Sequence, residues 1–576
     1  MKTFFKLLRA MFLGLGVSFF ILLVMAALVV QQHLQASSKK EELPKNITLS
    51  LTLSQPMVET VPSLVRSIAG DSAPPSLQEW IAGLELASKD EKISAVYIRA
   101  VGGSVTLTQA EELRASMANV RSAGKPVIFF ADTFGEMDNG TAMTYLASAA
   151  DKIILQPGGF AGFTGIGMQQ PFLRDFLNRN GILPEFEKRR DYKTAMDNLT
   201  ETGMTPENRA EMTRLITHLS DNVMMSVAKD RKMDLTQLAK LRDAAPLPAA
   251  LAGKLIDEVK YEDEITFPAE TVSLLDYFAN LSTPKFIETA PKIALVDAEG
   301  MIVRGTGQSG GPLTEKMIGA EDFAALLKEL QDNKDISAVI IRLNSPGGSA
   351  IASETIYRAM ENLKNSGKPV IISMTDTAAS GGYYMAAPAT KILALPSTLT
   401  GSIGVIVGKV SMGGLSQQYG VNWEEITAGK NAAMFGTGRG FNESERAAVA
   451  QSADAVYDTF KSRVAASRKL SPDVVEAIAQ GQVWTGTEAK EKGLVDEIGG
   501  LIEAIGAART ALGLEKDAVV VLLPYPDENN PFLFIQLLLK QMAVLNHTSF
   551  MNMIWDKILA EMHVRTLQMQ PVQLQY

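Results

Sequence analysis

Residues 93–99 read Ile-Ser-Ala-Val-Tyr-Ile-Arg, and residues 336–342 read Ile-Ser-Ala-Val-Ile-Ile-Arg. The sequence Gly-Lys-Pro-Val-Ile follows each stretch, beginning once at Gly124 and once at Gly367, so both landmarks share one separation of 243 positions. A period of this length is too long for a solenoid repeat and predicts a duplicated domain. Differences between the two copies therefore indicate where function resides.

Each copy has the pattern of an α/β unit. A short β-branched strand leads into a loop, then into an amphipathic stretch of helical length, and then into a second strand after Gly-Lys-Pro. This alternation predicts parallel strands joined by right-handed helical crossovers. The expected strands are residues 95–98 and 338–341, the expected helices are residues 108–122 and 352–365, and helical periodicity extends over residues 205–260 and 442–470.

The repeat and the two ends divide the chain into segments. The C-terminal end of the chain is largely apolar but interrupted by polar side chains, which favours an amphipathic helix over a membrane span. Such a helix would lie on the membrane, on a sister subunit or against the body. The expected segments are a basic segment 1–10, an anchor 11–30, a polar tether 31–46, a first copy 47–280, a linker 281–291, a second copy 292–525 and a tail 526–576.

The beginning of the chain has the pattern of a transmembrane helix. Lys2, Lys6 and Arg9 precede residues 11–30, which contain no charged residue. Roughly twenty residues at about 1.5 Å each match a hydrocarbon core of about 30 Å, and the basic flank stays on the cytoplasmic side. We therefore expect a single-pass anchor with the body outside the cytoplasm. A cleavable signal peptide ending near Ala36 is the alternative.

The composition excludes several classes of protein. The 576 residues include no cysteine, which removes a thiol nucleophile, a disulfide framework and cysteine-ligated zinc. A net charge of −9, without a long basic run, argues against a nucleic-acid partner. The length and the 46% of hydrophobic residues are sufficient for two substantial cores.

The loop after the repeated strand differs between the copies. The second copy continues from Arg342 with Leu-Asn-Ser-Pro-Gly-Gly-Ser, whereas the first continues from Arg99 with Ala-Val-Gly-Gly-Ser and lacks the proline. A Pro-Gly-Gly turn lets backbone N–H groups point outward without obstruction by Cβ, which a site for a developing oxyanion requires. Taken alone, the motif also fits a plain turn.

A serine follows the next strand of the second copy, in Thr-Ala-Ala-Ser-Gly-Gly-Tyr-Tyr. Ser380 is expected in a tight turn between strand and helix that holds its hydroxyl exposed, with the amide of Gly381 beside it to complete an oxyanion hole. Aligning Lys391 with Lys152 places Thr141 opposite Ser380. A turn serine without a catalytic role is the alternative.

A nucleophilic serine needs a base, and the chain has four histidines: His33, His218, His547 and His563. Three of them fall at the membrane boundary or in the tail, and His218 has no carboxylate in an obvious orienting position, so a Ser-His-Asp triad has poor support. A lysine remains possible if burial in an apolar pocket lowers its pKa by several units.

The candidate lysine is Lys193. Aligning Gly181 with Gly420 places Ala432 opposite Lys193, so the first copy has the lysine without Ser-Gly-Gly and the second has the reverse. This reciprocal pattern favours a site composed from both copies over a solvated surface lysine. Ser402, in a Leu-Thr-Gly-Ser-Ile-Gly stretch that the first copy lacks, is suited to orienting the lysine amine.

With these motifs the chain resembles the S49 family of serine proteases, in its long, duplicated signal peptide peptidase form. The resemblance covers nearly the whole body and rests on the anchor, the repeat and the motifs quoted above. It implies that Ser380 is the nucleophile, Lys193 the general base and Ser402 an assistant to Lys193. It further implies that the amides of Gly348 and Gly381 hold the oxyanion.

The resemblance also implies tandem ClpP/crotonase-like domains in a homotetramer on the outer, periplasmic face of the inner membrane. Its expected substrates are signal peptides and other apolar peptides, and it requires no cofactor or metal. A tethered protease would meet such peptides at high local concentration. The chain departs from the family at Arg190-Asp191, where Gly-Lys is common, and in its apolar tail. Asp191 would keep Lys193 charged unless its side chain points away.

Two other classes stay open. Crotonase-type enzymes act on acyl-CoA thioesters and share both the fold and a backbone oxyanion site, although they need neither an anchor nor a Ser/Lys pair. A catalytically silent scaffold of the same fold would bind membrane proteins without cutting them.

Overall fold

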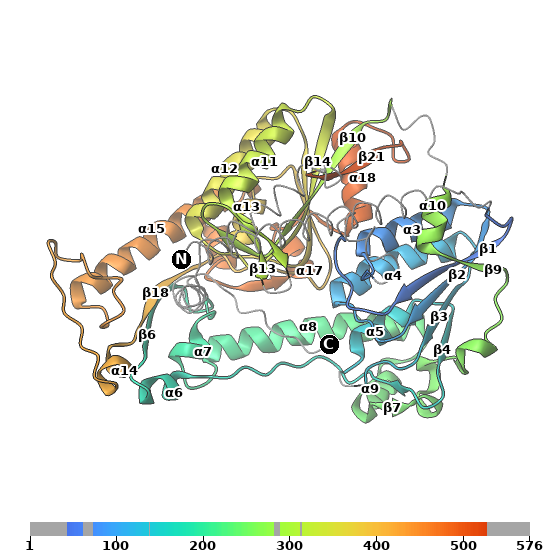
Figure 1. Ribbon diagram of the computed structural model, residues 1–576, viewed down its shortest axis with the longest axis horizontal. Coiled ribbons are helices and arrows are strands. Elements are labelled where there is room, and N and C mark those ends of the chain that lie inside the picture. Colours follow the sequence, from blue (N-terminus) through green and yellow to red (C-terminus); the bar gives the residue numbers. More distant parts are fainter. Residues whose placement is uncertain (1–42, 62–72, 137–138, 282–288, 312–313, 527–576) are drawn as a thin grey trace, which may run out of the picture.

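The computed structural model describes residues 43–61, 73–136, 139–281, 289–311 and 314–526 (Figure 1). The predicted basic segment 1–10, the anchor 11–30, the tether up to residue 42 and the tail from residue 527 lie outside the described residues. Within the described ranges, no helix is both long and apolar enough to cross a membrane.

The first copy forms a parallel sheet in the order β8-β4-β3-β2-β1-β9. Its central strands are buried along almost their whole length, as expected of a parallel sheet covered on both faces. The strands are β1 (Ile47–Leu53), β2 (Ile93–Ala100), β3 (Val127–Ala131), β4 (Lys152–Leu155), β8 (Glu258–Val259) and β9 (Glu270–Ser273).

The second copy repeats this order as β20-β16-β15-β14-β10-β21, and the end of β15 pairs in addition with β17, which pairs with β19. The prediction of a duplicated α/β unit is therefore confirmed. The strands are β10 (Lys292–Glu299), β14 (Ile336–Ser345), β15 (Val370–Ala379), β16 (Lys391–Ala394), β17 (Leu399–Gly401), β19 (Val483–Thr485), β20 (Glu497–Ile498) and β21 (Val521–Tyr525).

The crossover helices begin and end close to their predicted limits. A capping box between Thr106 and Gln109 starts α4, and the hydroxyl of Ser349 caps α12. The expectation of helix up to residue 260 is wrong beyond residue 244, because Pro246 and Pro248 cannot continue a helix. Seven of the longer helices are α3 (Leu77–Lys89), α4 (Leu107–Ser122), α8 (Pro206–Asp230), α9 (Leu235–Ala244), α11 (Ala320–Asp332), α12 (Ala350–Asn365) and α15 (Glu443–Arg468).

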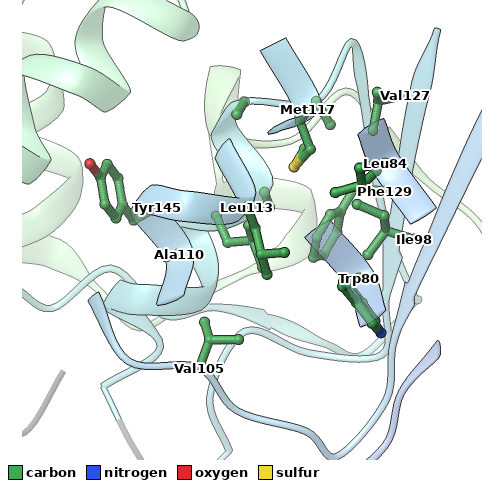
Figure 2. Close-up of a cluster of buried hydrophobic side chains, with 14 of the residues drawn as sticks. Trp80, Leu84, Ile98, Val105, Ala110, Leu113, Met117, Val127, Phe129 and Tyr145 are labelled. Atoms are coloured by element: carbon green, nitrogen blue, oxygen red, sulfur yellow. The ribbon is translucent and has the colours of Figure 1, made fainter. Parts of the chain in front are cut away.

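The core of the first copy packs α3 and α4 against its sheet. Figure 2 shows Trp80 and Leu84 of α3, with Leu113 of α4, close to Phe129 of β3. The same apolar cluster continues through α18 (Leu501–Ala511) into the sheet of the second copy. The two copies therefore share a core, which fixes their loops relative to each other.

One ribbon interlaces the copies. Strand β6 (Leu183–Arg189) belongs to the first copy but pairs antiparallel with β18 (Val405–Ser411) of the second, with Arg189 opposite Val405. The ribbon lies away from the first sheet, and α8 runs back toward that sheet (Figure 1). This crossing carries the segment that contains Lys193 into the second copy.

Candidate active site

Ser380 lies between β15 and α13 (Gly381–Ala386), as the turn motif predicts. Its φ of +53° is rare for a residue with a side chain, and its N–H donates to the carbonyl oxygen of Gly401 at 2.9 Å. The expectation of an exposed hydroxyl is wrong, because Ser380 is only 4% exposed. The side chain is instead buried against Lys193, which belongs to the segment from the first copy.

Lys193 follows the crossing strand β6 and is 2% exposed. Its Nζ lies 3.0 Å from Ser380 Oγ, 2.9 Å from Ser402 Oγ and 2.9 Å from Ser402 O. Burial lowers the pKa of Lys193 from 10.5 to about 7, against a smaller opposing effect of Glu211. A substantial fraction of Lys193 is therefore neutral near pH 7.

The contacts of Lys193 match the hydrogen bonding of a neutral amine, which has two N–H donors and one lone pair. The carbonyl oxygen of Ser402 can only accept a hydrogen bond, and Ser402 Oγ is placed to accept the second. The lone pair then remains for the hydroxyl of Ser380. Ser402 holds this position at a φ of +50°, with its N–H donating to Gln482 O at 2.7 Å.

The backbone amides of Gly348 and Gly381 lie close together beside Ser380. A bridge of two 2.9 Å hydrogen bonds fixes the loop of Gly348 to Ile302, whose N–H donates to Gly347 O and whose oxygen accepts from Ser349 N–H. A Cβ on Gly381 would lie 3.1 Å from Gly348 N, so the two turns are in contact. Among the described residues, neither the Gly348 nor the Gly381 amide has a hydrogen-bond acceptor. Two free donors beside a serine hydroxyl are what an oxyanion hole requires.

Glu211, on α8 of the first copy, is a site residue that the sequence reasoning missed. It is 2% exposed, and its Oε1 accepts from Val483 N–H at 2.7 Å, while Oε2 is buried without a partner among the described residues. Burial raises the pKa of this carboxyl to about 7. The sequence did indicate that Glu211 is buried, because it falls on the same helical stripe as the buried Leu215 and Leu219.

A buried ion cluster fixes the strand that leads to Gly348. Arg342 on β14 is 2% exposed and donates to both carboxylate oxygens of Glu59 and of Glu112, at 2.7 to 3.1 Å. Both acids belong to the first copy, so the catalytic loop of the second copy depends on the first for its support. The sequence could not show this dependence, because the two copies have an arginine at the same position of the repeated strand but use it differently. Arg99 of the first copy pairs with Glu262 and is more exposed.

The structure also tests the expectations for Asp191 and His218. Asp191 is exposed, so the carboxylate that acts on Lys193 is Glu211 instead. The expectation that His218 lacks a carboxylate partner is wrong, because its Nδ1 lies 3.3 Å from Glu488 Oε1. That pair still provides no triad, since the hydroxyl of Ser380 is paired with Lys193.

Comparisons with known proteins identify the family of the chain. Residues 119–274 and 362–515 match the model of peptidase family S49, and residues 308–400 match that of Clp protease. The chain is 30% identical to the chloroplastic serine protease SPPA of Arabidopsis thaliana, over 85% of this chain and 73% of that protein. It is 31% identical to Protease 4 of Haemophilus influenzae, over 70% of this chain and 68% of that protein.

A shorter match is a candidate signal peptide peptidase, SppA, of Enterococcus faecium, which is 31% identical over 43% of this chain and 73% of that protein. The two S49 matches fall one in each copy of the duplicated ClpP-like α/β fold. These matches favour a peptidase over both an acyl-CoA enzyme and a silent scaffold. The chain belongs to peptidase family S49 and is a serine endopeptidase.

Proposed function

We propose that this serine endopeptidase uses a Ser/Lys dyad divided between its two copies. Neutral Lys193 takes the proton of Ser380, and the serine oxygen attacks the peptide carbonyl carbon. The amides of Gly348 and Gly381 stabilise the oxyanion that forms. Lys193 then protonates the leaving amine, and a water that gives its proton to the same lysine hydrolyses the acyl-enzyme. Ser402 positions the amine throughout.

The observation that carries this mechanism is the 3.0 Å approach of Lys193 Nζ to Ser380 Oγ inside a buried site. In water a lysine is protonated at neutral pH and has no lone pair to accept a proton. Here burial supplies the neutral form, and Ser402 occupies both N–H donors. The geometry leaves one direction for the lone pair, which is toward the serine.

The proposed substrates are cleaved signal peptides and other apolar peptides at the inner membrane. The charge-free stretch 11–30 after Lys2, Lys6 and Arg9 supports a single-pass anchor with residues 1–10 in the cytoplasm and the body in the periplasm. A tethered body meets membrane-bound peptides at a high local concentration. The name of the matched Enterococcus faecium protein supports the same substrate class.

We further propose that the protein assembles as a homotetramer through the arm formed by β6, β18 and the neighbouring residues 413–441. Large apolar side chains are exposed there, and such patches are typical of subunit contacts. Sedimentation of an Ile426→Glu variant would show a lower mass if the arm is the contact. The exposed side chains are Leu183, Tyr419, Val421, Trp423, Ile426 and Phe435.

The test is cleavage of a synthetic signal peptide by the full-length protein in detergent. Ser380→Ala and Lys193→Ala should each lose activity by at least a thousandfold while the oligomer stays intact, whereas Lys240→Ala, at an exposed position of α9, should behave as wild type. Normal cleavage by Lys193→Ala would refute the divided dyad. Equal cleavage of a charged, water-soluble peptide would refute the substrate class and leave the dyad standing.

A further inference from the structure

The first copy contains a cavity of about 320 Å³ at the place that corresponds to the active site of the second. Its lining includes residues 103–104, from the loop after β2, and residues 142–143, from α5 (Thr141–Ser148). In the alignment of the copies, these positions match the loop of Gly348 and the turn that follows Ser380. The cavity in the first copy is therefore built from the loops that, in the second copy, carry Gly348 and Ser380. We call the one in the first copy the first-copy site.

The first-copy site has lost the groups needed for cleavage. Thr141 replaces the serine, and its Oγ1 donates to Gly165 O at 2.9 Å and accepts from Gly165 N–H at 3.0 Å. That hydroxyl is occupied by the backbone, and no lysine or arginine of the described residues forms a hydrogen bond with it. None of the described lining residues is charged, so these residues offer neither a general base nor a general acid.

The walls that remain are suited to an apolar ligand. Met57, Val105, Ala142 and Met143 line the cavity and are buried, whereas Ser104 stands exposed at its rim. Methionine side chains adapt to ligands of varied shape, and the cavity volume falls at the lower end of the range for binding pockets. The cavity therefore fits one or two uncharged apolar side chains of an extended peptide.

We propose that the first-copy site binds an apolar stretch of the substrate polypeptide without cutting it. The inference rests on the proposed function for its choice of ligand, since a site built from the same loops would meet the same peptides. A chain held in this site while another stretch is cut stays at a high effective concentration near Ser380. Long apolar peptides should therefore bind more tightly than peptides short enough to occupy one site alone.

The first experiment counts bound peptides. Full-length Ser380→Ala protein in detergent is titrated with a short, uncharged, end-blocked apolar peptide that carries a fluorophore. We expect two peptides per chain. Adding Ser104→Trp, which blocks the rim from an exposed position, should leave one. Adding Ser122→Trp, at the exposed far end of the helix α4 that follows this loop, should leave two. One peptide per chain before the rim is blocked, or two afterwards, would overturn the inference.

The second experiment uses the active enzyme. Ser104→Trp should raise KM for an apolar peptide of some twenty residues by on the order of tenfold, and leave KM for the short peptide unchanged. An equal effect on both peptides would show that the substitution disturbs the catalytic site and would refute a separate site. If wild type binds two peptides per chain but cleaves neither, the proposed function fails and the first-copy site stands. If wild type cleaves the peptide but binds only one per chain, the proposed function stands and the first-copy site fails.

Discussion

The dependence of cleavage on pH tests the proposed base most directly. With a pKa of about 7, the neutral fraction of Lys193 rises from about one tenth at pH 6 to about nine tenths at pH 8. The value of kcat/KM for an end-blocked, uncharged peptide should therefore rise about tenfold over this range and then level off. A lysine with its ordinary pKa of 10.5 would give a rise of about a hundredfold without a plateau. Such a curve would refute a desolvated base.

Removing the charge of Glu211 should shift the dependence of kcat/KM on pH. Its charge raises the pKa of Lys193, so Glu211→Gln should move the midpoint of the rate profile to lower pH. The glutamine keeps an oxygen that can accept from Val483 N–H. Asp221→Asn, at an exposed position of the same helix, removes the same charge and should leave the midpoint in place. An unmoved midpoint in Glu211→Gln would show that the two groups do not interact.

Three further predictions concern a close backbone approach, the Arg342 cluster and the buried lysine. A Cβ on Gly481, where φ is +86°, would lie 2.5 Å from Lys193 N, so Gly481→Ala should lower kcat by about a hundredfold or more. The control is Gly493→Ala, because Gly493 also has a positive φ, of +74°, but a Cβ there would meet no atom closer than 3.5 Å; this variant should keep the wild-type rate. Arg342→Met leaves the carboxylates of Glu59 and Glu112 without their partner and should lower the free energy of unfolding by about 3 to 5 kcal/mol, and an unchanged urea midpoint would contradict the role of this cluster. The folded pKa of Lys193 lies below its unfolded value of 10.5, so burying the lysine lowers stability by its full amount below pH 7 and by less as the pH rises. Relative to Lys193→Met, wild type should therefore gain about 3 kcal/mol of unfolding free energy between pH 6 and pH 9. A difference between the two proteins that does not change with pH would mean that the lysine stays charged.

The repeated strands and their helices could be predicted because each is a local pattern. The β-branched strands of both copies, the helix after each loop and the turn at Ser380 depend on residues that are neighbours in the sequence. The pairing of Ser380 with Lys193 could also be predicted although the two residues are far apart in the sequence, because each copy lacks what the other has. What the sequence could not show is how the lysine crosses, because that depends on the pairing of β6 with β18 across more than two hundred residues.

The acids around the site were missed for a related reason. Glu59, Glu112 and Glu211 look like ordinary charged residues in the sequence, and they matter because a partner from the other copy lies against each of them. Glu112 and Glu211 also occupy buried stripes of their helices, where a charged residue is out of place. A carboxylate on an otherwise apolar helical stripe is therefore a usable signal for a buried polar contact.

The division of the dyad has an energetic consequence. Burial is what lowers the pKa of Lys193, and that burial requires β6 to pair with β18 and α8 to pack beside β19. Before the copies dock, the lysine is in water and is protonated at neutral pH, so it cannot accept a proton from Ser380. The Gly348 loop depends on the same docking through Arg342, Glu59 and Glu112. The proposed base and the support of the oxyanion site therefore form together, and an incompletely folded chain would have neither.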